Sequence, residues 1–287
     1  RPGLASAPGG PPRGLVDAAA VSTLRVREGW QGHLDPPVTG EELARLAEAT
    51  DEELGGYARA CRDYCDRVRP EDLVGNLAGH QALHELVVWP SLREGLRFGD
   101  RVLDFPCVIG RVTALALKAV DSDLGKAGHA VGVDVSRPAL ARAAQIVPGA
   151  TFLEIPGTGA LPFPPACFDA VVSMVALQHL QFFPVRHRYF LEFARVLVPG
   201  GRLLVQLNAD DAGDCIRWFR RGRWDHYLLP DVVCNEAEIR AYLPAVGFEV
   251  GRTWSSEMDT AAVSWERRER GRADGWLWVL ATRRPDP

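Results

Sequence analysis

The spacing of apolar residues divides the chain into two parts. Before about residue 95 the apolar positions recur every three to four residues, as in Leu73, Leu77, Leu83, Leu86 and Val87, and this period predicts amphipathic helices. From residue 101 onward, short apolar runs alternate with helical patterns. Strands that alternate with helices are typical of a parallel sheet with helical crossovers. The pattern therefore predicts helices first and an α/β domain after them.

Start and stop signals place the individual elements. Thr39 with Glu42, and Thr50 with Glu53, have the capping-box spacing, in which a hydroxyl and a carboxylate satisfy backbone donors at a helix start. The predicted helices span 40–49, 51–67, 72–93, 110–120, 137–146, 184–197 and 235–245. The third is expected to break near Pro90, because proline cannot donate a helix hydrogen bond. The predicted strands span 101–105, 130–135, 150–155, 168–174, 202–208, 248–250 and 275–281.

These elements divide the chain into three regions. Residues 1–20 are rich in proline, glycine and alanine, with too little apolar patterning to offset ordering entropy, so we expect a flexible tail. Residues 21–95 form an N-terminal helical cap. Residues 96–287 form a Rossmann-like α/β domain, with a doubly wound, mostly parallel sheet and an antiparallel edge. Within this domain, an insertion at about 209–234 follows the fifth strand.

Composition narrows the function classes. The chain has 287 residues, 47% of them hydrophobic and 24% charged, with a net charge of -4. A protein without a basic field has little means of holding a polynucleotide by counterion release, so we expect no nucleic-acid partner. No apolar run approaches the roughly 20 residues of a membrane helix, and the N-terminus lacks the order of a signal peptide. These features predict no membrane association and a cytoplasmic location.

Cysteine and histidine spacing gives no sign of a metal site. The six cysteines lack paired CxxC spacing, and we interpret them as reduced thiols. His80 with His84, and Cys61 with Cys65, have the i,i+4 spacing that could bind a metal, but no third ligand is evident. We interpret both pairs as helix packing and predict no metal.

The first chemical motif lies where the predicted sheet begins. The strand that opens at Arg101 ends at Asp104 and turns through a small-residue loop into a helix, and the next strand ends at Asp134. In a doubly wound sheet, a ligand lies beyond the carboxyl ends of the strands, and an acid at the end of the second strand accepts hydrogen bonds from ribose hydroxyls. Alternatively, Asp134 merely caps the next helix beside Ser136. Val108 stands where such loops normally have glycine.

Three further motifs follow in order. They are Leu161-Pro-Phe-Pro-Pro-Ala-Cys-Phe-Asp-Ala-Val-Val-Ser173, Leu177-Gln-His-Leu180 and Arg195-Val-Leu-Val-Pro-Gly-Gly-Arg-Leu-Leu204. Together with the first motif they resemble the class I S-adenosylmethionine-dependent methyltransferases, in particular the small-molecule branch. The resemblance covers about residues 96–255 and implies an enzyme with S-adenosylmethionine as cofactor.

The resemblance also implies which residues face the cofactor. Asp104, Cys107 and Gly110 would lie against its methionine part, Asp134 on its ribose, and the segments after the third and fourth strands near its adenine and its sulfonium. The full set of predicted cofactor-binding residues is Asp104, Phe105, Pro106, Cys107, Gly110, Arg111, Asp134, Val135, Gly157, Thr158, Met174, Val175 and Ala176. Gly157 departs from the family, since many relatives carry an acid there.

His179 is the predicted catalytic base for the acceptor, because it follows the fourth strand and an imidazole titrates near neutrality. A histidine bonded only to backbone is the alternative. Asp210 and Asp211 could orient an amine or hydroxyl, although turn formation explains them equally well. The segment 217–227 mixes arginines with aromatics, which suits a planar or acidic substrate as well as a solvated basic loop. The predicted substrate-binding residues are Gln178, His179, Asn208, Arg217, Trp218, Arg221, Trp224, His226 and Tyr227.

These observations predict a methyltransferase that acts on a small organic acceptor, at oxygen, nitrogen or carbon, in biosynthesis such as secondary metabolism. Because Val108 replaces a motif glycine, the alternative is a protein of the same fold that transfers no methyl group: a cyclase-type or other non-methylating catalyst, or a binding or scaffold protein. The cap residues Trp30 and Tyr57 could belong to a lid or to a homodimer contact, and the sequence does not separate these roles.

Overall fold

The computed structural model describes residues 25–27, 39–69, 88–121, 128–209, 216–225, 231–258 and 274–285. Its strands form one sheet, in the order β1-β9-β10-β6-β5-β2-β3-β4, with β7 and β8 beside β6. The strands are β1 (Arg25–Arg27), β2 (Arg101–Asp104), β3 (His129–Asp134), β4 (Thr151–Glu154), β5 (Phe168–Ser173), β6 (Leu197–Asn208), β7 (Ile216–Arg217), β8 (Val232–Val233), β9 (Phe248–Met258) and β10 (Asp274–Arg283).

The sheet has a parallel body and an antiparallel edge, as the sequence predicted. The strands β6, β5, β2, β3 and β4 are parallel neighbours, whereas β10 pairs antiparallel with β6 and β9, and β9 with β1. The edge strands are longer than expected. The strand predicted at 248–250 is in fact eleven residues long, because β9 pairs with β10 along almost its whole length.

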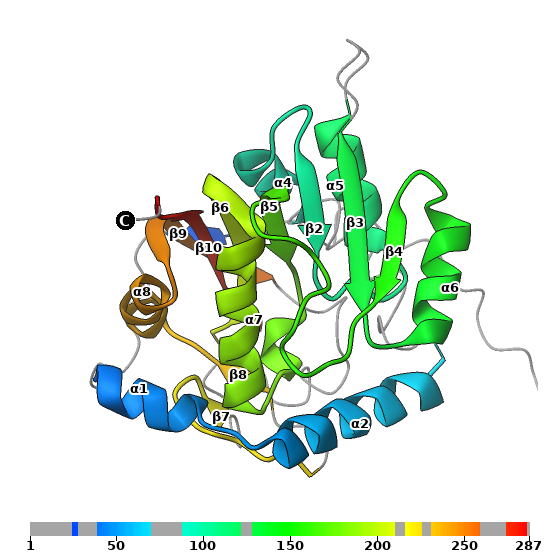
Figure 1. The fold of residues 1–287 in the computed structure, drawn as a ribbon. Coiled ribbons are helices and arrows are strands. Elements are labelled where there is room, and N and C mark those ends of the chain that lie inside the picture. Colours follow the sequence, from blue (N-terminus) through cyan, green and yellow to red (C-terminus); the bar gives the residue numbers. More distant parts are fainter. Residues whose placement is uncertain are drawn as a thin grey trace, which may run out of the picture.

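The chain order reverses at β2. From β2 the chain moves through β3 to β4 at one edge, and then returns to β5 on the other side of β2 (Figure 1). A crevice forms at such a switch point, outside the carboxyl ends of the strands. The fold therefore brings the ends of β2, β3 and β5 together, and with them Asp104, Asp134 and Ser173.

The described helices follow the predicted positions within a residue or two. They are α1 (Gly40–Ala47), α2 (Asp51–Arg67), α4 (Trp89–Gly95), α5 (Arg111–Val120), α6 (Arg137–Ile146), η4 (Leu177–His179), α7 (Phe183–Val196) and α8 (Glu236–Ala245). Both predicted capping boxes are present. A helix boundary lies beside Pro90, because α4 begins at Trp89 and this proline is in its first turn, where its missing N–H costs nothing. The predicted helix 72–93 otherwise falls mostly outside the described residues.

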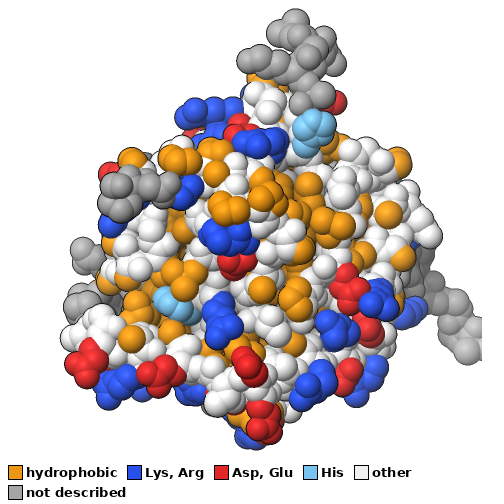
Figure 2. Space-filling model, viewed as in Figure 1, with side chains coloured by type: hydrophobic (Ala, Val, Ile, Leu, Met, Phe, Trp, Pro, Cys, Tyr) orange, Lys and Arg blue, Asp and Glu red, His pale blue; other side chains and the backbone are white. Residues whose placement is uncertain are grey.

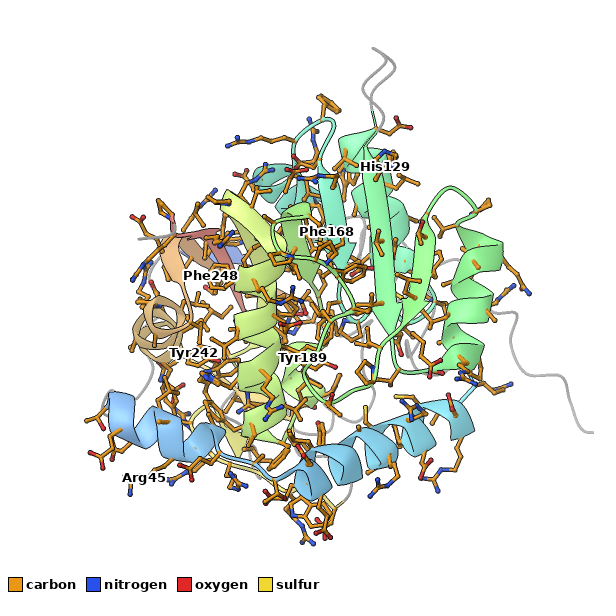
Figure 3. All side chains as sticks on the ribbon, in the orientation of Figure 1. Arg45, His129, Phe168, Tyr189, Tyr242 and Phe248 are labelled. Carbon is orange, nitrogen blue, oxygen red and sulfur yellow. The ribbon has the colours of Figure 1, made fainter. Side chains whose placement is uncertain are left out.

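Helices α1 and α2 lie across the end of the molecule at which the parallel strands finish, and α7 packs on one face of the sheet (Figure 1). Aromatic rings pack on α7, among them Tyr189 of this helix on Phe193 and Tyr242 of α8 on Phe190. Figure 3 labels both tyrosines, and it labels Arg45 and His129 near opposite ends of the molecule. Both tyrosines are 1% exposed. In the described part of the chain, we find no helix with the length and apolar character to cross a membrane.

Candidate functional site at the carboxyl ends of the strands

Asp134 is the centre of the site. Its Oδ2 accepts the backbone N–H of Val108 at 3.0 Å, and its Oδ1 accepts the N–H of Ser136 at 3.0 Å. The hydroxyl of Ser136, not Asp134, caps α6 by accepting the N–H of Ala139. The carboxylate is thus directed at the first loop. A carboxylate has about four acceptor positions, so it keeps capacity for a ligand hydroxyl.

A second buried carboxyl, that of Asp104, lies at the end of the neighbouring strand. It accepts the Thr113 hydroxyl at 2.6 Å, and its exposed fraction is 1%. Burial is the main cause that raises the pKa of Asp104 to about 7, with a smaller contribution from the charge of Asp134. Burial also raises the pKa of Asp134, against the lowering effect of its backbone donors. The crevice therefore concentrates negative charge that a cationic ligand could neutralise.

Val108 has a left-handed backbone, with φ of 48°. This conformation is a genuine outlier for a β-branched residue. It lets the Val108 N–H reach Asp134. The glycine that this loop normally carries would reach the same geometry without strain, so the substitution has kept the shape of the loop at a cost in backbone energy.

Replacing Val108 with glycine is expected to raise the free energy of unfolding by about 1 kcal/mol. Release of left-handed strain contributes about 1–2 kcal/mol, and the added freedom of the unfolded chain costs about 0.5–1 kcal/mol. Urea unfolding measures the difference. The control is Val112→Gly in the helix α5, which has no left-handed strain to release and should lose stability through backbone entropy and through lost packing against the core. A loss at both positions contradicts the account.

The remaining predicted cofactor-binding residues differ in whether their side chains lie in the apolar cores or at the edge of the sheet. The side chains of Phe105 and Met174 lie in the two apolar cores, and the ring of Phe105 packs on Tyr189 at 4.3 Å, so only their backbones can face the crevice. Val175 also has a left-handed backbone, with φ of 53°, and its N–H donates to Gln206 at 2.5 Å. The structure places the others on the same edge, namely Pro106, Cys107, Gly110, Arg111, Val135, Gly157, Thr158 and Ala176.

Helix α2 covers this edge. A Cβ added at Gly157 would lie 3.3 Å from the Cβ of Ala58, so the helix packs on the segment after β4. Near its C-terminal end, Arg62 donates to the carbonyl of Pro156 at 3.4 Å. Near its start, the Tyr57 hydroxyl donates to the carbonyl of His179 at 3.5 Å. The cap helix therefore spans the crevice from β4 to η4, in the position of a lid.

His179 is held by a carboxylate and not by backbone alone. Its Nδ1 lies 3.0 Å from Oδ1 of Asp231, a residue that the sequence analysis did not select. The side chain of His179 is 41% exposed, whereas that of Asp231 is 10% exposed. A histidine with a buried carboxylate partner on one nitrogen and solvent on the other side is suited to accept or donate a proton.

The arginines of the segment 216–225 form ion pairs with carboxylates of α8, of α2 and of the segment itself. Arg217 pairs with Glu238 at 3.4 Å, Arg221 with Glu53 at 2.8 Å and Arg223 with Asp225 at 2.7 Å. The segment is therefore not the free basic loop that its composition suggested. Most of the positive charges of this segment pair with carboxylates of the protein, and Arg221 joins the segment to α2.

Two glycines allow this close packing. A Cβ at Gly56 of α2 would lie 2.6 Å from the ring of Trp224, and one at Gly222 would lie 2.1 Å from the carbonyl oxygen of Gln181. Gly222 also has a positive φ of 70°, which only glycine adopts without strain. The segment is thereby fixed against both the cap and the linker that leads into α7.

Trp218 and Arg186 form a buried pair in this segment. The Trp218 ring is 1% exposed and packs on Phe190 and Tyr242, so it is a core residue and cannot stack on a ligand at the surface. The fully buried Arg186 lies 4.7 Å from this ring and donates to the Trp218 carbonyl at 2.6 Å. Sequence reasoning missed Arg186, although it interrupts the apolar face of α7.

The structure describes some of the remaining predicted site residues and not others. Asn208 ends β6 and is 2% exposed. Gln178 is 6% exposed, and among the described residues neither its Oε1 nor the buried Ser173 Oγ has a hydrogen-bond partner. The predictions that lie outside the described residues concern the tail 1–20, Trp30, His80, His84, Asp210, Asp211, His226 and Tyr227.

Comparison with known proteins identifies what this site resembles. A family model described as a methyltransferase domain matches residues 103–205, the part that carries the crevice. A Micromonospora griseorubida protein, provisionally named 23S rRNA (guanine-N(1)-)-methyltransferase, is 31% identical over 213 residues. The match covers 70% of this chain and 61% of the relative, so the chain spans about three fifths of the length of that curated protein. The relative's name is at odds with the expectation that no nucleic acid is involved.

Solved structures share the fold. A SAM-dependent methyltransferase from Methanosarcina mazei aligns with a TM-score of 0.54 and 17% identity, over 69% of this chain and 98% of its own. The [4+2]-cyclase SpnF aligns with a TM-score of 0.52 and 20% identity, over 69% of this chain and 80% of its own. At these identities the likeness concerns the fold alone, and the fold occurs with more than one kind of chemistry.

Proposed function

We propose that the chain is a class I S-adenosylmethionine-dependent methyltransferase, as its similarity to a methyltransferase family model and to a methyltransferase relative supports, and that it transfers a methyl group to a small organic acceptor. S-adenosylmethionine supplies an electrophilic methyl group on a sulfonium. The observation that carries the proposal is the buried Asp134 carboxylate at the end of β3, which is joined to the first loop by the Val108 N–H.

The residues of the crevice fit this cofactor. Asp134 has acceptor capacity for ribose hydroxyls, and the carboxyl of Asp104 suits the cationic methionine part. Ser173 Oγ at the end of β5 and Gln178 Oε1 in η4 are buried and have no hydrogen-bond partner within the described residues, and buried polar groups of this kind call for a ligand or water. Val108 does not block the site by its backbone, because its N–H points at Asp134.

Three features favour a small acceptor over a polynucleotide. Three of the four arginines of the 216–225 segment, namely Arg217, Arg221 and Arg223, pair with carboxylates of the protein. Lys and Arg side chains alternate with Asp and Glu over α1 and α2, and form no continuous basic field on the face that Figure 2 shows. The net charge is -4. Binding of a nucleic-acid backbone depends on unpaired positive charge.

The second candidate is methylation of a nucleobase, which the name of the Micromonospora griseorubida relative favours. The two candidates differ in how binding of the acceptor depends on salt concentration. Affinity for RNA falls steeply with salt concentration, because each neutralised phosphate releases counterions, whereas binding of an uncharged small acceptor does not. Filter binding of a ribosomal RNA fragment at 50 and 200 mM salt separates the two candidates.

Calorimetric titration with S-adenosylmethionine and S-adenosylhomocysteine tests the proposal. We expect both to bind, and we expect Asp134→Ala to weaken both about 10-fold to 100-fold, because hydrogen bonds to a charged group contribute about 1.5–3 kcal/mol. The control is Asp51→Ala, which removes an exposed carboxylate at the start of α2 and should leave the affinity unchanged. If neither compound binds the parent protein, a non-methylating role of this fold becomes the better account.

A further inference from the structure

His179 and Asp231 form a pair whose two ends face different surroundings. The Nδ1–Oδ1 distance is 3.0 Å. The carboxylate side is 10% exposed and the imidazole side 41% exposed. His179 is thus the more exposed partner of the pair, and Nε2 is its ring nitrogen that does not face Asp231.

Both partners are held by backbone hydrogen bonds at the edge of the sheet. The carbonyl of Asp231 accepts the N–H of Ile216 at 2.9 Å, and the strand β8 that follows pairs with Asn208 at the end of β6. The His179 N–H donates to Ala176 at 2.9 Å, and its carbonyl accepts the N–H of Gln181 at 3.1 Å. The pair is therefore part of the scaffold and not a chance contact between two loops.

A carboxylate at this distance selects one tautomer of the imidazole. Asp231 can only accept at Nδ1 when ionised, so the neutral imidazole carries its proton on Nδ1 and leaves the lone pair on Nε2. When Nε2 takes up a proton, the charge of Asp231 stabilises the imidazolium that forms. This arrangement makes His179 a directed base.

We propose that Asp231 is the positioning residue for His179, and that the acceptor of the methyl transfer is a hydroxyl group, of the phenol class. The inference rests on the proposed function above. In the step, the hydroxyl proton passes to Nε2 of His179 while the hydroxyl oxygen forms its bond to the methyl carbon. The electron pair of the broken carbon–sulfur bond remains on sulfur, and the imidazolium later releases its proton to water.

The nature of the base selects this class of acceptor. A phenol has a pKa near about 10, so at neutral pH it keeps its proton and is a poor nucleophile without a base. An uncharged amine already offers a lone pair, and removal of its proton can follow the transfer. A buried carboxylate behind the imidazole is useful chiefly when the proton must leave during the attack.

The first test measures the tautomer directly. Nitrogen-15 NMR of the seven histidines, with the His179 signal assigned by its loss in His179→Gln, reports which ring nitrogen carries the proton. We expect the Nδ1–H form in the parent protein and a shift toward the Nε2–H form in Asp231→Asn. Glu94→Gln, which removes a carboxylate in an exposed pair with Arg252, should change nothing. An Nε2–H form in the parent overturns the proposal.

The second test measures turnover on a panel of phenols, catechols and aromatic amines with S-adenosylmethionine labelled in the methyl group. We expect phenol turnover, with kcat reduced about 100-fold in Asp231→Asn and at least as much in His179→Gln, at a KM within about threefold of the parent value. Methylation confined to amines, or to a ribosomal RNA fragment, overturns the proposal, as does full activity in Asp231→Asn.

The two proposals fail in different ways. Absence of calorimetric binding of S-adenosylmethionine defeats the proposed function, whatever the tautomer. Normal cofactor binding, combined with an unchanged His179 signal in Asp231→Asn, defeats only the assignment of Asp231. Retained secondary structure by circular dichroism ensures that a loss in either variant is not caused by unfolding.

Discussion

Replacing Arg186 with methionine is expected to destabilise the protein by about 3 kcal/mol. The guanidinium is fully buried and donates to the backbone carbonyls of Leu180, Gln181 and Trp218. Methionine has a similar length but no donor, so these buried acceptors lose their partner, and each unsatisfied group costs about 1–3 kcal/mol. Relief from burying a charge offsets part of this loss, since desolvation lowers the pKa of Arg186 to about 10.

The loss of stability should be largest near η4 and in the segment 216–225, which carry the three carbonyls that Arg186 contacts. Leu180 and Gln181 follow η4, and Trp218 belongs to the segment that pairs with the cap, so Arg186 joins the two elements. Urea unfolding gives the change in stability, and hydrogen exchange at these residues shows where it acts. Lysine at this position should recover little, because a compact ammonium does not match the planar fork of an arginine.

The control for this prediction is Arg45→Met, which changes an exposed arginine of α1 and should alter stability by no more than about 0.5 kcal/mol. Equal stability of the Arg186→Met variant and the parent would mean that water or a repacked side chain satisfies the three carbonyls. In that case Arg186 does not organise the acceptor side, and its burial would need another explanation.

The sequence predicted the parts of the fold that depend on local signals. Thr39 and Thr50 located two helix starts because a capping box is complete within four residues. The position of Asp104 and Asp134 on one edge followed from topology, because parallel strands present their carboxyl ends together. Such predictions need only the nearest residues and a general rule of chain connection.

The parts that were missed depend on contacts between distant residues. Asp231 lies 52 residues from His179. It reaches the imidazole because β8 pairs with β6. A strand of two apolar residues gives too little sequence signal to predict that pairing. The left-handed backbone of Val108 follows from its bond to Asp134, which runs against local propensity. Arg186 was the one omission with a readable signal, an arginine on the face of α7 that also carries Phe183, Phe190 and Phe193.

Replacing Asp104 with asparagine is expected to stabilise the protein at pH 8 by several kcal/mol while it weakens cofactor binding. The pKa of the Asp104 carboxyl is raised from 3.8 to about 7, chiefly by burial. Because the folded-state pKa lies above the unfolded value, the protonated carboxyl favours the folded protein. Its contribution is complete below about pH 4 and is lost as the pH rises toward 7, at about 1.4 kcal/mol per pH unit.

Asparagine is uncharged and can still accept the Thr113 hydroxyl, so the variant avoids this loss. Unfolding by urea should show the variant more stable than the parent by about 1–2 kcal/mol at pH 5 and by about 4 kcal/mol at pH 8, since the loss begins above about pH 4 and is complete near pH 7. Glu52→Gln, at an exposed carboxyl of α2, controls for the loss of one negative charge. A larger stability difference at pH 5 than at pH 8 would reverse the sign and contradict the assignment.

Affinity for S-adenosylmethionine should change in the opposite direction, with binding weakened at least 10-fold at pH 8, because an ionised carboxylate attracts the cationic methionine part and an amide does not. A carboxyl that destabilises the folded protein but strengthens binding of a ligand has its role in ligand binding. If Asp104→Asn lowered both stability and affinity, the residue would be a packing element of the β2 end, and the negative charge of the crevice would rest on Asp134 alone.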